Sequence, residues 1–266
     1  MKIAVVQFPG TNCEHETLVA ARSAGLSGEI FRWNRPAEEL SSFDGYIIPG
    51  GFSYQDRLRA GAIASKEPVM DALREEAEEG KPIIGICNGF QILVEAGLLP
   101  GLGGVDAALA SNVMVSKGEI VRRGFYCAWT TLRHEAPPRR CSGSFLLEVG
   151  ELVRMPLAHA EGNLVTVDPD LMARLNEDHQ VVFRYCNEAG EVDPEYPVNI
   201  NGSLENVAGI CNPEGNVLGM MPHPERSSFA WQLQPTDPGK SVGDMEAPGP
   251  GRRIFESMKR YIEVRR

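Results

Sequence analysis

The sequence predicts an α/β fold with a doubly wound, mostly parallel central sheet flanked by helices. In the first half, short runs that are apolar throughout alternate with amphipathic helical patterns. Strands that are apolar on both faces are typical of parallel sheets covered by helices. In the second half, short strand candidates follow one another with few helical patterns between them, which indicates an antiparallel addition to the same sheet.

The first half supplies the parallel strands and their connecting helices. Strands are expected at residues 2–8, 29–33, 45–49 and 83–86, and helices at 12–24, 68–79 and 88–96. Asn12 is the expected N-cap of the first helix, and Gly25 follows its end. Pro68 opens the second helix and Gly80 follows it, which is the usual order of these two residues.

The second half supplies shorter elements. Strands are expected at 111–116, 125–132, 145–149, 164–167, 181–186 and 206–211, followed by a hairpin strand within 215–226 that leads into a loop. Residues 227–251 are rich in Pro, Gly and Ser and are expected to form a loop insertion before a final helix at 252–264. The length suits a single domain over residues 1–266.

Composition excludes several functional classes. The net charge is −10 and the basic residues form no stripe, so nucleic-acid binding is not expected. No apolar run reaches the roughly 20 residues of a membrane span, and the start lacks a signal-peptide pattern, so a cytoplasmic protein is expected. The six cysteines form no C-x-x-C pair, so neither a zinc site nor any other metal site is expected.

The stretch "GICNGFQ" (85–91) places Cys87 between two glycines where a strand turns into a helix. A sharp turn of this kind presents its corner residue at the top of the sheet and needs small neighbours, as in a nucleophile elbow. The helix that follows directs its N-terminal amides at the sulfur and favours the thiolate. A buried core cysteine also fits this position, so the assignment depends on finding partner residues.

The second half offers an imidazole and a carboxylate in "PHPE" (222–225). A residue before proline is biased toward extended backbone, and residues two apart in an extended chain face the same side. His223 and Glu225 are therefore predicted to pair, with the carboxylate fixing the imidazole tautomer of an acid–base residue. His159 and Glu161 have the same spacing without the prolines and form a rival pair, whose alternative is a structural or partner-facing loop.

An oxyanion needs hydrogen-bond donors beside the nucleophile. Gly50 and Gly51 follow a predicted strand end and can turn backbone N–H groups toward a neighbouring strand end. We expect these donors at Gly51 and Phe52, together with the backbone N–H of Asn88.

Together, "IIPGGFS" (47–53), "GICNGFQ" (85–91) and "PHPE" (222–225) resemble the class I, or triad, glutamine amidotransferases. Further stretches, among them "FRYCN" (183–187) and "NINGSLENVAGICNPEGNVLGMMPHPER" (199–226), closely resemble the glutaminase subunits of phosphoribosylformylglycinamidine synthases over most of the chain. The resemblance implies one amidotransferase domain in which Cys87 is the nucleophile, His223 the acid–base and Glu225 its orienter. It also implies that Gln91 contributes to glutamine binding.

The resemblance further implies the partners. Ammonia from glutamine would pass to a synthetase subunit, assisted by a small accessory subunit, for de novo purine synthesis. ATP and Mg²⁺ would bind to that synthetase, and no cofactor is expected in this chain, which has no Walker A pattern. Gln55, Arg57 and Ala160 depart from the family pattern, which has a glycine at the first and last of these positions. Two alternatives remain. One is a stand-alone cysteine amidase or peptidase of similar fold, and the other is an inactive relative that serves as a binding or regulatory subunit.

Overall fold

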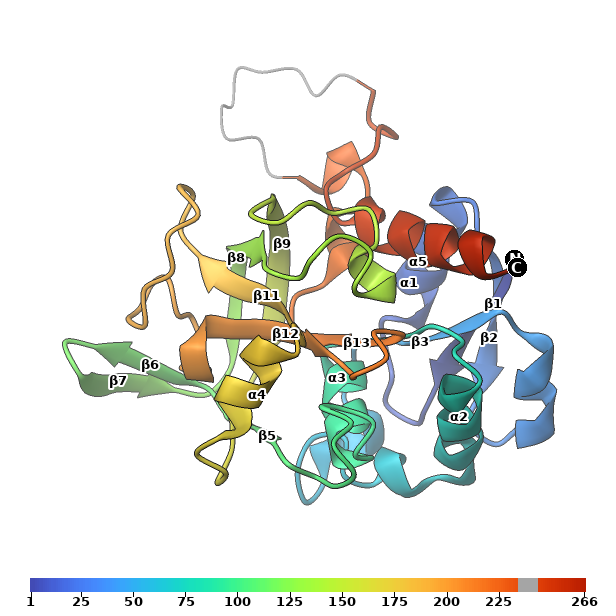
Figure 1. Ribbon diagram of the computed structural model, residues 1–266, viewed down its shortest axis with the longest axis horizontal. Helices are drawn as coiled ribbons and strands as arrows, with labels where there is room; N and C mark the ends of the chain where they lie inside the picture. The colour runs from blue at the N-terminus through green and yellow to red at the C-terminus, as the bar shows by residue number, and fades with distance from the viewer. Residues whose placement is uncertain (234–243) are drawn as a thin grey trace.

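The computed structural model describes residues 1–233 and 244–266, and within them a nine-stranded sheet runs through the centre of the protein (Figure 1). The strand order is β2-β1-β3-β4-β13-β12-β11-β8-β9. Five neighbouring strands are parallel: β2 (Ser27–Arg32), β1 (Lys2–Gln7), β3 (Gly45–Ile48), β4 (Ile83–Ile86) and β13 (Val217–Met220). Four more continue the sheet in antiparallel pairing: β12 (Val207–Cys211), β11 (Val181–Cys186), β8 (Tyr126–His134) and β9 (Leu152–His159). The predicted fold class is confirmed.

Helices cover both faces of the parallel half. Figure 1 shows α1 (Glu14–Ser23) and α5 (Arg252–Arg265) on one face and α2 (Pro68–Glu78) and α3 (Asn88–Glu95) on the other. The strands β3 and β4 between these layers are buried at every position, mostly as Ile and Tyr, which explains their uninterrupted apolar sequence. A shorter helix, α4 (Leu171–Glu177), precedes β11. In the part of the chain that the structure describes, no helix is both long and apolar enough to cross a bilayer.

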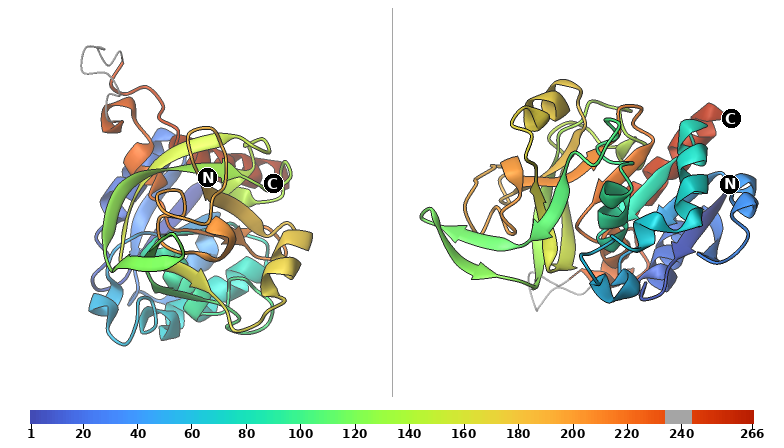
Figure 2. Two further views of the ribbon diagram at one scale, coloured as in Figure 1. Left: turned by 90° about the vertical axis from the view of Figure 1, so that its left-hand side faces the viewer. Right: turned by 90° about the horizontal axis from the view of Figure 1, so that it is seen from below.

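Two small sheets stand beside the central one. β5 (Ala108–Ser111) pairs with β10 (Glu161–Val165), and β6 (Val113–Ser116) pairs with β7 (Glu119–Arg123). The β6–β7 hairpin projects from the body of the protein, beyond β8 and β11 (Figure 1, Figure 2). Its base is held by a bond from the Gly124 N–H to the Asn112 carbonyl, at 3.2 Å.

Several predicted elements are wrong in detail. The first helix begins at Glu14, and its N-cap is Cys13 without a side-chain capping bond, so Asn12 is not the cap. The strand predicted at 111–116 is two strands, separated at the buried Asn112. Residues 145–149 form turns rather than a strand, because they directly follow a short 3₁₀ turn at Ser142–Ser144. The strands β7 and β9 and the helix α4 were not predicted.

The predicted loop insertion at 227–251 lies partly outside the described residues, at 234–243. Its described ends contain a short 3₁₀ turn at Ala230–Gln232 and no strand or α-helix. The two ends lie against each other, since the N–H groups of Gly249 and Gly251 donate to the carbonyls of Ser228 and Ser227, both at 2.9 Å. The chain therefore enters α5 close to the point where it left the end of β13.

Candidate active site

Cys87 lies at the corner between β4 and α3, in a backbone conformation that side chains rarely adopt (φ 52°, ψ −106°). Its glycine neighbours are required by contact. A Cβ on Gly89 would stand 1.9 Å from the carbonyl oxygen of Ile48, and one on Gly85 would stand 2.7 Å from the backbone of Gly89. The predicted elbow is confirmed, and strain at a corner of this kind is typical of functional sites.

The topology of the sheet brings the distant imidazole to this corner. β13 pairs in parallel with β4, with Met220 opposite Ile86, so the carboxyl ends of both strands lie side by side. The Cys87 N–H donates to the Met220 carbonyl at 2.8 Å, and the His223 N–H donates to the Pro156 carbonyl of β9 at 2.8 Å. Ligand and catalytic groups in open α/β sheets gather at such carboxyl ends.

His223 and Glu225 form the predicted pair. The distance between His223 Nδ1 and Glu225 Oε1 is 2.5 Å, and both side chains are buried. The backbone between the two residues is a turn and not the extended chain that was predicted, because Pro224 begins a short 3₁₀ helix, Pro224–Ser227. The turn still brings the Glu225 carboxylate to the His223 ring. With Nδ1 donating to the carboxylate, Nε2 is left to exchange a proton with the nucleophile, and within the described chain this buried atom has no hydrogen-bond partner.

The charges of the site favour an ionised imidazole. Burial lowers the pKa of His223, but the Glu225 carboxylate and the Cys87 thiolate oppose this effect and hold the pKa well above its ordinary value. An imidazolium beside the sulfur stabilises the thiolate, which is the nucleophilic form of cysteine. The arrangement therefore suits a cysteine nucleophile paired with a histidine acid–base.

Two contacts around the imidazole, with Gly50 and with Cys13, were not predicted from the sequence. Gly50 lies against the ring, and a Cβ there would stand 2.7 Å from His223 Cε1. Cys13 lies on the same side, and its sulfur accepts a hydrogen bond from Arg226 Nη2 at 3.0 Å. Ligand atoms of Cys13, His223 and Glu225 lie within 4.8 Å of one another, but the Arg226 guanidinium on the sulfur opposes a bound cation there.

The predicted oxyanion donors differ in how free they are. Thr11 and Gly51 form an antiparallel bridge flanked by bonds from Asn12 N to Gly50 O and from Phe52 N to Gly10 O. In such a bridge the central residue directs its N–H away from its partner, so the Gly51 N–H is left for another acceptor. The Phe52 N–H is occupied at 2.9 Å, and Phe52 is not a free donor in this arrangement.

Asn88 and Gln91 hold the surrounding segments together. Asn88 is the first residue of α3, so its backbone N–H has no partner within the helix and can serve an oxyanion. Its side-chain oxygen accepts the Ser53 N–H at 3.0 Å, which fixes the Gly51 segment beside the elbow. Gln91, predicted to bind glutamine, accepts a bond from Asn88 Nδ2 at 2.9 Å and donates to the Glu161 carbonyl.

The rival pair lies close to the site but is unsuited to act as its base. The Ala158 carbonyl is 3.8 Å from Cys87 Sγ, and the next residue, His159, lies near enough to His223 to be affected by its charge. Burial and the charge of His223 lower the pKa of His159 to about 3, so it is neutral and weakly basic. Its predicted carboxylate partner is elsewhere, because Glu161 Oε2 accepts the Ala60 N–H at 3.1 Å.

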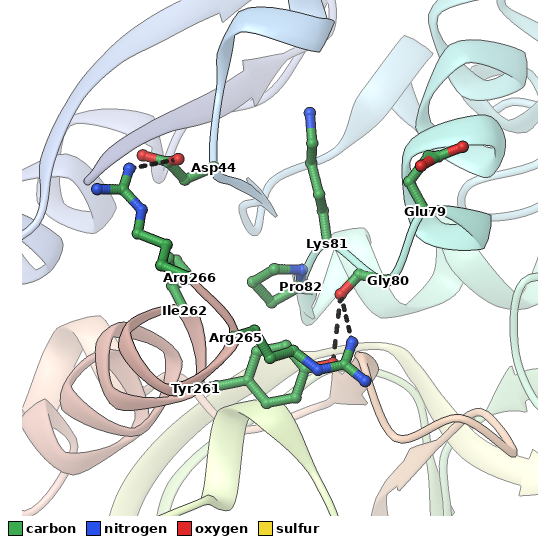
Figure 3. A pocket seen from close by; sticks show the side chains of 9 residues that line it. All are labelled: Asp44, Glu79, Gly80, Lys81, Pro82, Tyr261, Ile262, Arg265 and Arg266. Carbon is green, nitrogen blue, oxygen red and sulfur yellow. Dashed lines mark hydrogen bonds and ion pairs between the residues drawn. The ribbon is translucent and has the colours of Figure 1, made fainter.

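A pocket of about 390 Å³ lies at the opposite edge of the sheet, between the N-terminal ends of β3 and β4 and the end of α5 (Figure 3). Its two arginines are paired. Arg266 contacts Asp44 at 2.6 Å, and Arg265 donates to the Gly80 carbonyl at 3.0 Å. Cys87, His223 and Glu225 do not line this pocket, so we assign no part of the chemistry to it.

Comparison with known proteins agrees with this geometry. Residues 1–262 match the family described as the CobB/CobQ-like glutamine amidotransferase domain. The match spans nearly the whole chain, so the protein belongs to that family of glutamine amidotransferases.

Among its relatives, the chain is 68% identical to the phosphoribosylformylglycinamidine synthase subunit PurQ of Methanothrix thermoacetophila, over 100% of both chains. It is 49% identical to subunit PurQ of Pyrococcus furiosus, over 86% of this chain and 90% of that protein. A chain in the solved structure of PurLQS from Thermotoga maritima superposes with a TM-score of 0.70 at 32% identity, covering 98% of both chains. Within its family, the protein is therefore grouped with the PurQ subunits.

Proposed function

We infer that this protein is the glutaminase subunit of a phosphoribosylformylglycinamidine synthase. The observation that carries the proposal is the meeting of Cys87 with the His223–Glu225 pair at the ends of adjacent parallel strands. The similarity to PurQ subunits over the whole chain supports the particular assignment. We place the reaction in the cytoplasm, where purines are made.

The reaction is acyl transfer to sulfur. The Cys87 thiolate attacks the side-chain amide carbon of glutamine, and the carbonyl oxygen becomes an oxyanion. The N–H groups of Gly51 and Asn88 are the donors best placed to stabilise it.

His223 then transfers the protons. Amide nitrogen is a poor leaving group, so the imidazolium protonates it and ammonia departs from a glutamyl thioester. The neutral imidazole next takes a proton from water, which hydrolyses the thioester to glutamate and restores the thiol. Glu225 keeps Nδ1 protonated throughout and orients the ring.

The ammonia is consumed by a synthetase subunit, which converts formylglycinamide ribonucleotide to formylglycinamidine ribonucleotide. The relatives are described as subunits of a synthase, which supports a partner of this kind, and a small accessory subunit completes the proposed complex. ATP and Mg²⁺ belong to the synthetase in this proposal, and we assign no cofactor to the present chain.

Glutamate release from glutamine tests the proposal, measured with and without the synthetase subunit. The native chain should be weakly active alone and more active with its partner, whereas Cys87→Ala should lose about 10⁴-fold or more. Equal release by the native chain and Cys87→Ala would exclude Cys87 as the nucleophile. High turnover without any partner would indicate a stand-alone amidase.

A further inference from the structure

A buried asparagine links the base of the β6–β7 hairpin to the active site. Asn112 is fully buried, and its side-chain nitrogen donates to the carbonyls of His159 at 2.7 Å and Gly124 at 3.1 Å. Its side-chain oxygen accepts the Gly162 N–H at 2.9 Å and lies 3.2 Å from His159 Nδ1. The residue therefore contacts His159 both through the backbone and through the ring.

These contacts determine the tautomer of His159. The two carbonyl acceptors and the Gly162 donor fix which end of the Asn112 amide is oxygen. Because an oxygen faces Nδ1, that ring nitrogen must carry the hydrogen. In a neutral imidazole the other nitrogen, Nε2, then has no hydrogen and presents a lone pair.

Among the described residues, His159 Nε2 is buried and has no hydrogen-bond partner. Gly162 packs against the ring, since a Cβ there would stand 2.3 Å from Cε1, and the contact of Nδ1 with Asn112 holds the ring in its orientation. An unmet buried acceptor costs about 1–3 kcal/mol, so its persistence needs an explanation.

The ring lies close enough to the His223 imidazole for the charge of His223 to lower its pKa. The carbonyl of the preceding residue, Ala158, is 3.8 Å from Cys87 Sγ. His159 ends β9, the same strand whose Pro156 carbonyl accepts the His223 N–H. Both catalytic residues thus contact the chain within three positions of His159.

Glutamine brings N–H donors to the active site, on its carboxamide and on its α-ammonium, and its product ammonia is a donor as well. We propose that His159 Nε2 accepts an N–H hydrogen bond from bound glutamine. Asn112 is the positioning residue, because its bond to Nδ1 keeps the hydrogen on Nδ1 and leaves Nε2 unprotonated. The inference rests on the proposed glutaminase activity and adds to it an acceptor distinct from the oxyanion donors.

His159→Ala removes the acceptor, whereas His159→Gln places an amide oxygen near the position of Nε2. With the synthetase subunit present, kcat/KM for glutamine should fall about tenfold in His159→Ala, the scale of one neutral hydrogen bond. His159→Gln should recover part of the loss. Asn112→Ala should lower kcat/KM for glutamine by a smaller factor than His159→Ala. The variant keeps the His159 ring, but the ring hydrogen is no longer held on Nδ1 and can move to Nε2.

Two further substrates identify the donor. Glutamate γ-methyl ester lacks the carboxamide N–H, and glutaric acid monoamide lacks the α-ammonium. If His159→Ala lowers kcat/KM for glutamine and the monoamide but not for the ester, the bond is donated by the carboxamide. If it lowers kcat/KM for glutamine and the ester but not for the monoamide, the bond is donated by the α-ammonium. An equal loss on all three substrates, or no loss on any, would overturn the proposal.

His134→Ala is the matched control. His134 is equally buried in the same half of the sheet, but both of its ring nitrogens have partners, the Glu148 carbonyl and Ser144 Oγ. Its replacement should affect the three substrates alike. Cys87→Ala should abolish turnover of all three, and failure of that control would reject the glutaminase assignment itself rather than the role of His159.

Discussion

The parallel and antiparallel halves of the central sheet position their functional groups by different means. In the parallel half, β3 and β4 are buried at every position, and the elbow is shaped by glycines in contact with neighbouring backbone. In the antiparallel half, β8 and β9 alternate between buried and more exposed positions. There, buried asparagines hold the segments that face the site.

The difference predicts how substitutions destabilise each half of the sheet. A side chain added at the elbow meets backbone that cannot move, so the cost is steric. Removal of a buried asparagine leaves donors and acceptors without partners, so the cost is electrostatic. His223 belongs to the junction, since it follows a parallel strand and donates its N–H to an antiparallel one.

The largest effect is expected at this junction, from Glu225→Gln. The variant keeps the size of the side chain but removes the charge that orients and ionises His223, so kcat/KM for glutamine should fall by about 10³–10⁴-fold. Steady-state glutamate release measures the loss. A fall of less than tenfold, with native stability, would show that the carboxylate is not needed.

Gly89→Ala tests the steric rule of the parallel half. The new Cβ would stand 1.9 Å from the Ile48 carbonyl oxygen, so the free energy of unfolding should fall by about 3 kcal/mol. Urea denaturation measures it. Gly104→Ala is the control, because its Cβ would have nothing closer than 3.7 Å, and a similar loss in both variants would refute the steric explanation.

Asn112→Ala tests the electrostatic rule of the antiparallel half. The change removes bonds to two carbonyls, one N–H and one ring nitrogen, and should lower the free energy of unfolding by about 2–4 kcal/mol. Asn187→Ala is the control, since the Asn187 side chain also bonds to the backbone, accepting two N–H groups, but lies in an exposed loop. Equal losses would mean that burial of the network does not matter.

The charge of His223 at the junction should make the free energy of unfolding depend on pH. The pKa of His223 is raised in the folded protein, against the lowering effect of burial, by Glu225 and Cys87. The stabilisation from its charge is therefore complete below the ordinary histidine pKa of about 6.5 and is lost as pH rises through the folded value. Denaturation of the native chain and Glu225→Gln should differ most near pH 6 and less at pH 9; a difference that grows with pH would contradict the assignment.

The smallest effect is expected at Gln55, where the resemblance led us to expect a glycine. Gln55 adopts a left-handed conformation (φ 61°, ψ 28°), which costs a side chain about 1 kcal/mol. Gln55→Gly should therefore raise the free energy of unfolding by up to about 1 kcal/mol, and Gln55→Ala should not. Thermal denaturation of the two variants provides the comparison.

The sequence predicted the parallel half well because its signals are local. Continuous apolar runs bounded by Gly and Pro gave β1, β3, β4, α2 and α3 with bounds close to those observed. The antiparallel half was predicted less well. Pro156 interrupts β9 and is tolerated because β9 is the edge strand of the sheet, while β7 is exposed at every position and shows no alternation.

The site divides in the same way. Cys87, His223 and Glu225 were predicted because each lies in a short motif whose spacing has a chemical reason. Cys13 and Asn112 were not, because their contacts come from segments far along the chain and no local pattern records them. Phe52 was predicted as a donor from its position after two glycines, but the bridge to Gly10 that occupies its N–H is a tertiary contact.

The place of β13 in the sheet also has a consequence during synthesis. This strand follows the other eight strands of the central sheet along the chain, yet it must insert between β4 and β12 at the middle of the sheet. Until it does so, the nascent chain holds Cys87 without His223 and Glu225 beside it. If the proposed roles hold, a chain cut before β13 keeps Cys87 but lacks His223 and Glu225, and it should not hydrolyse glutamine.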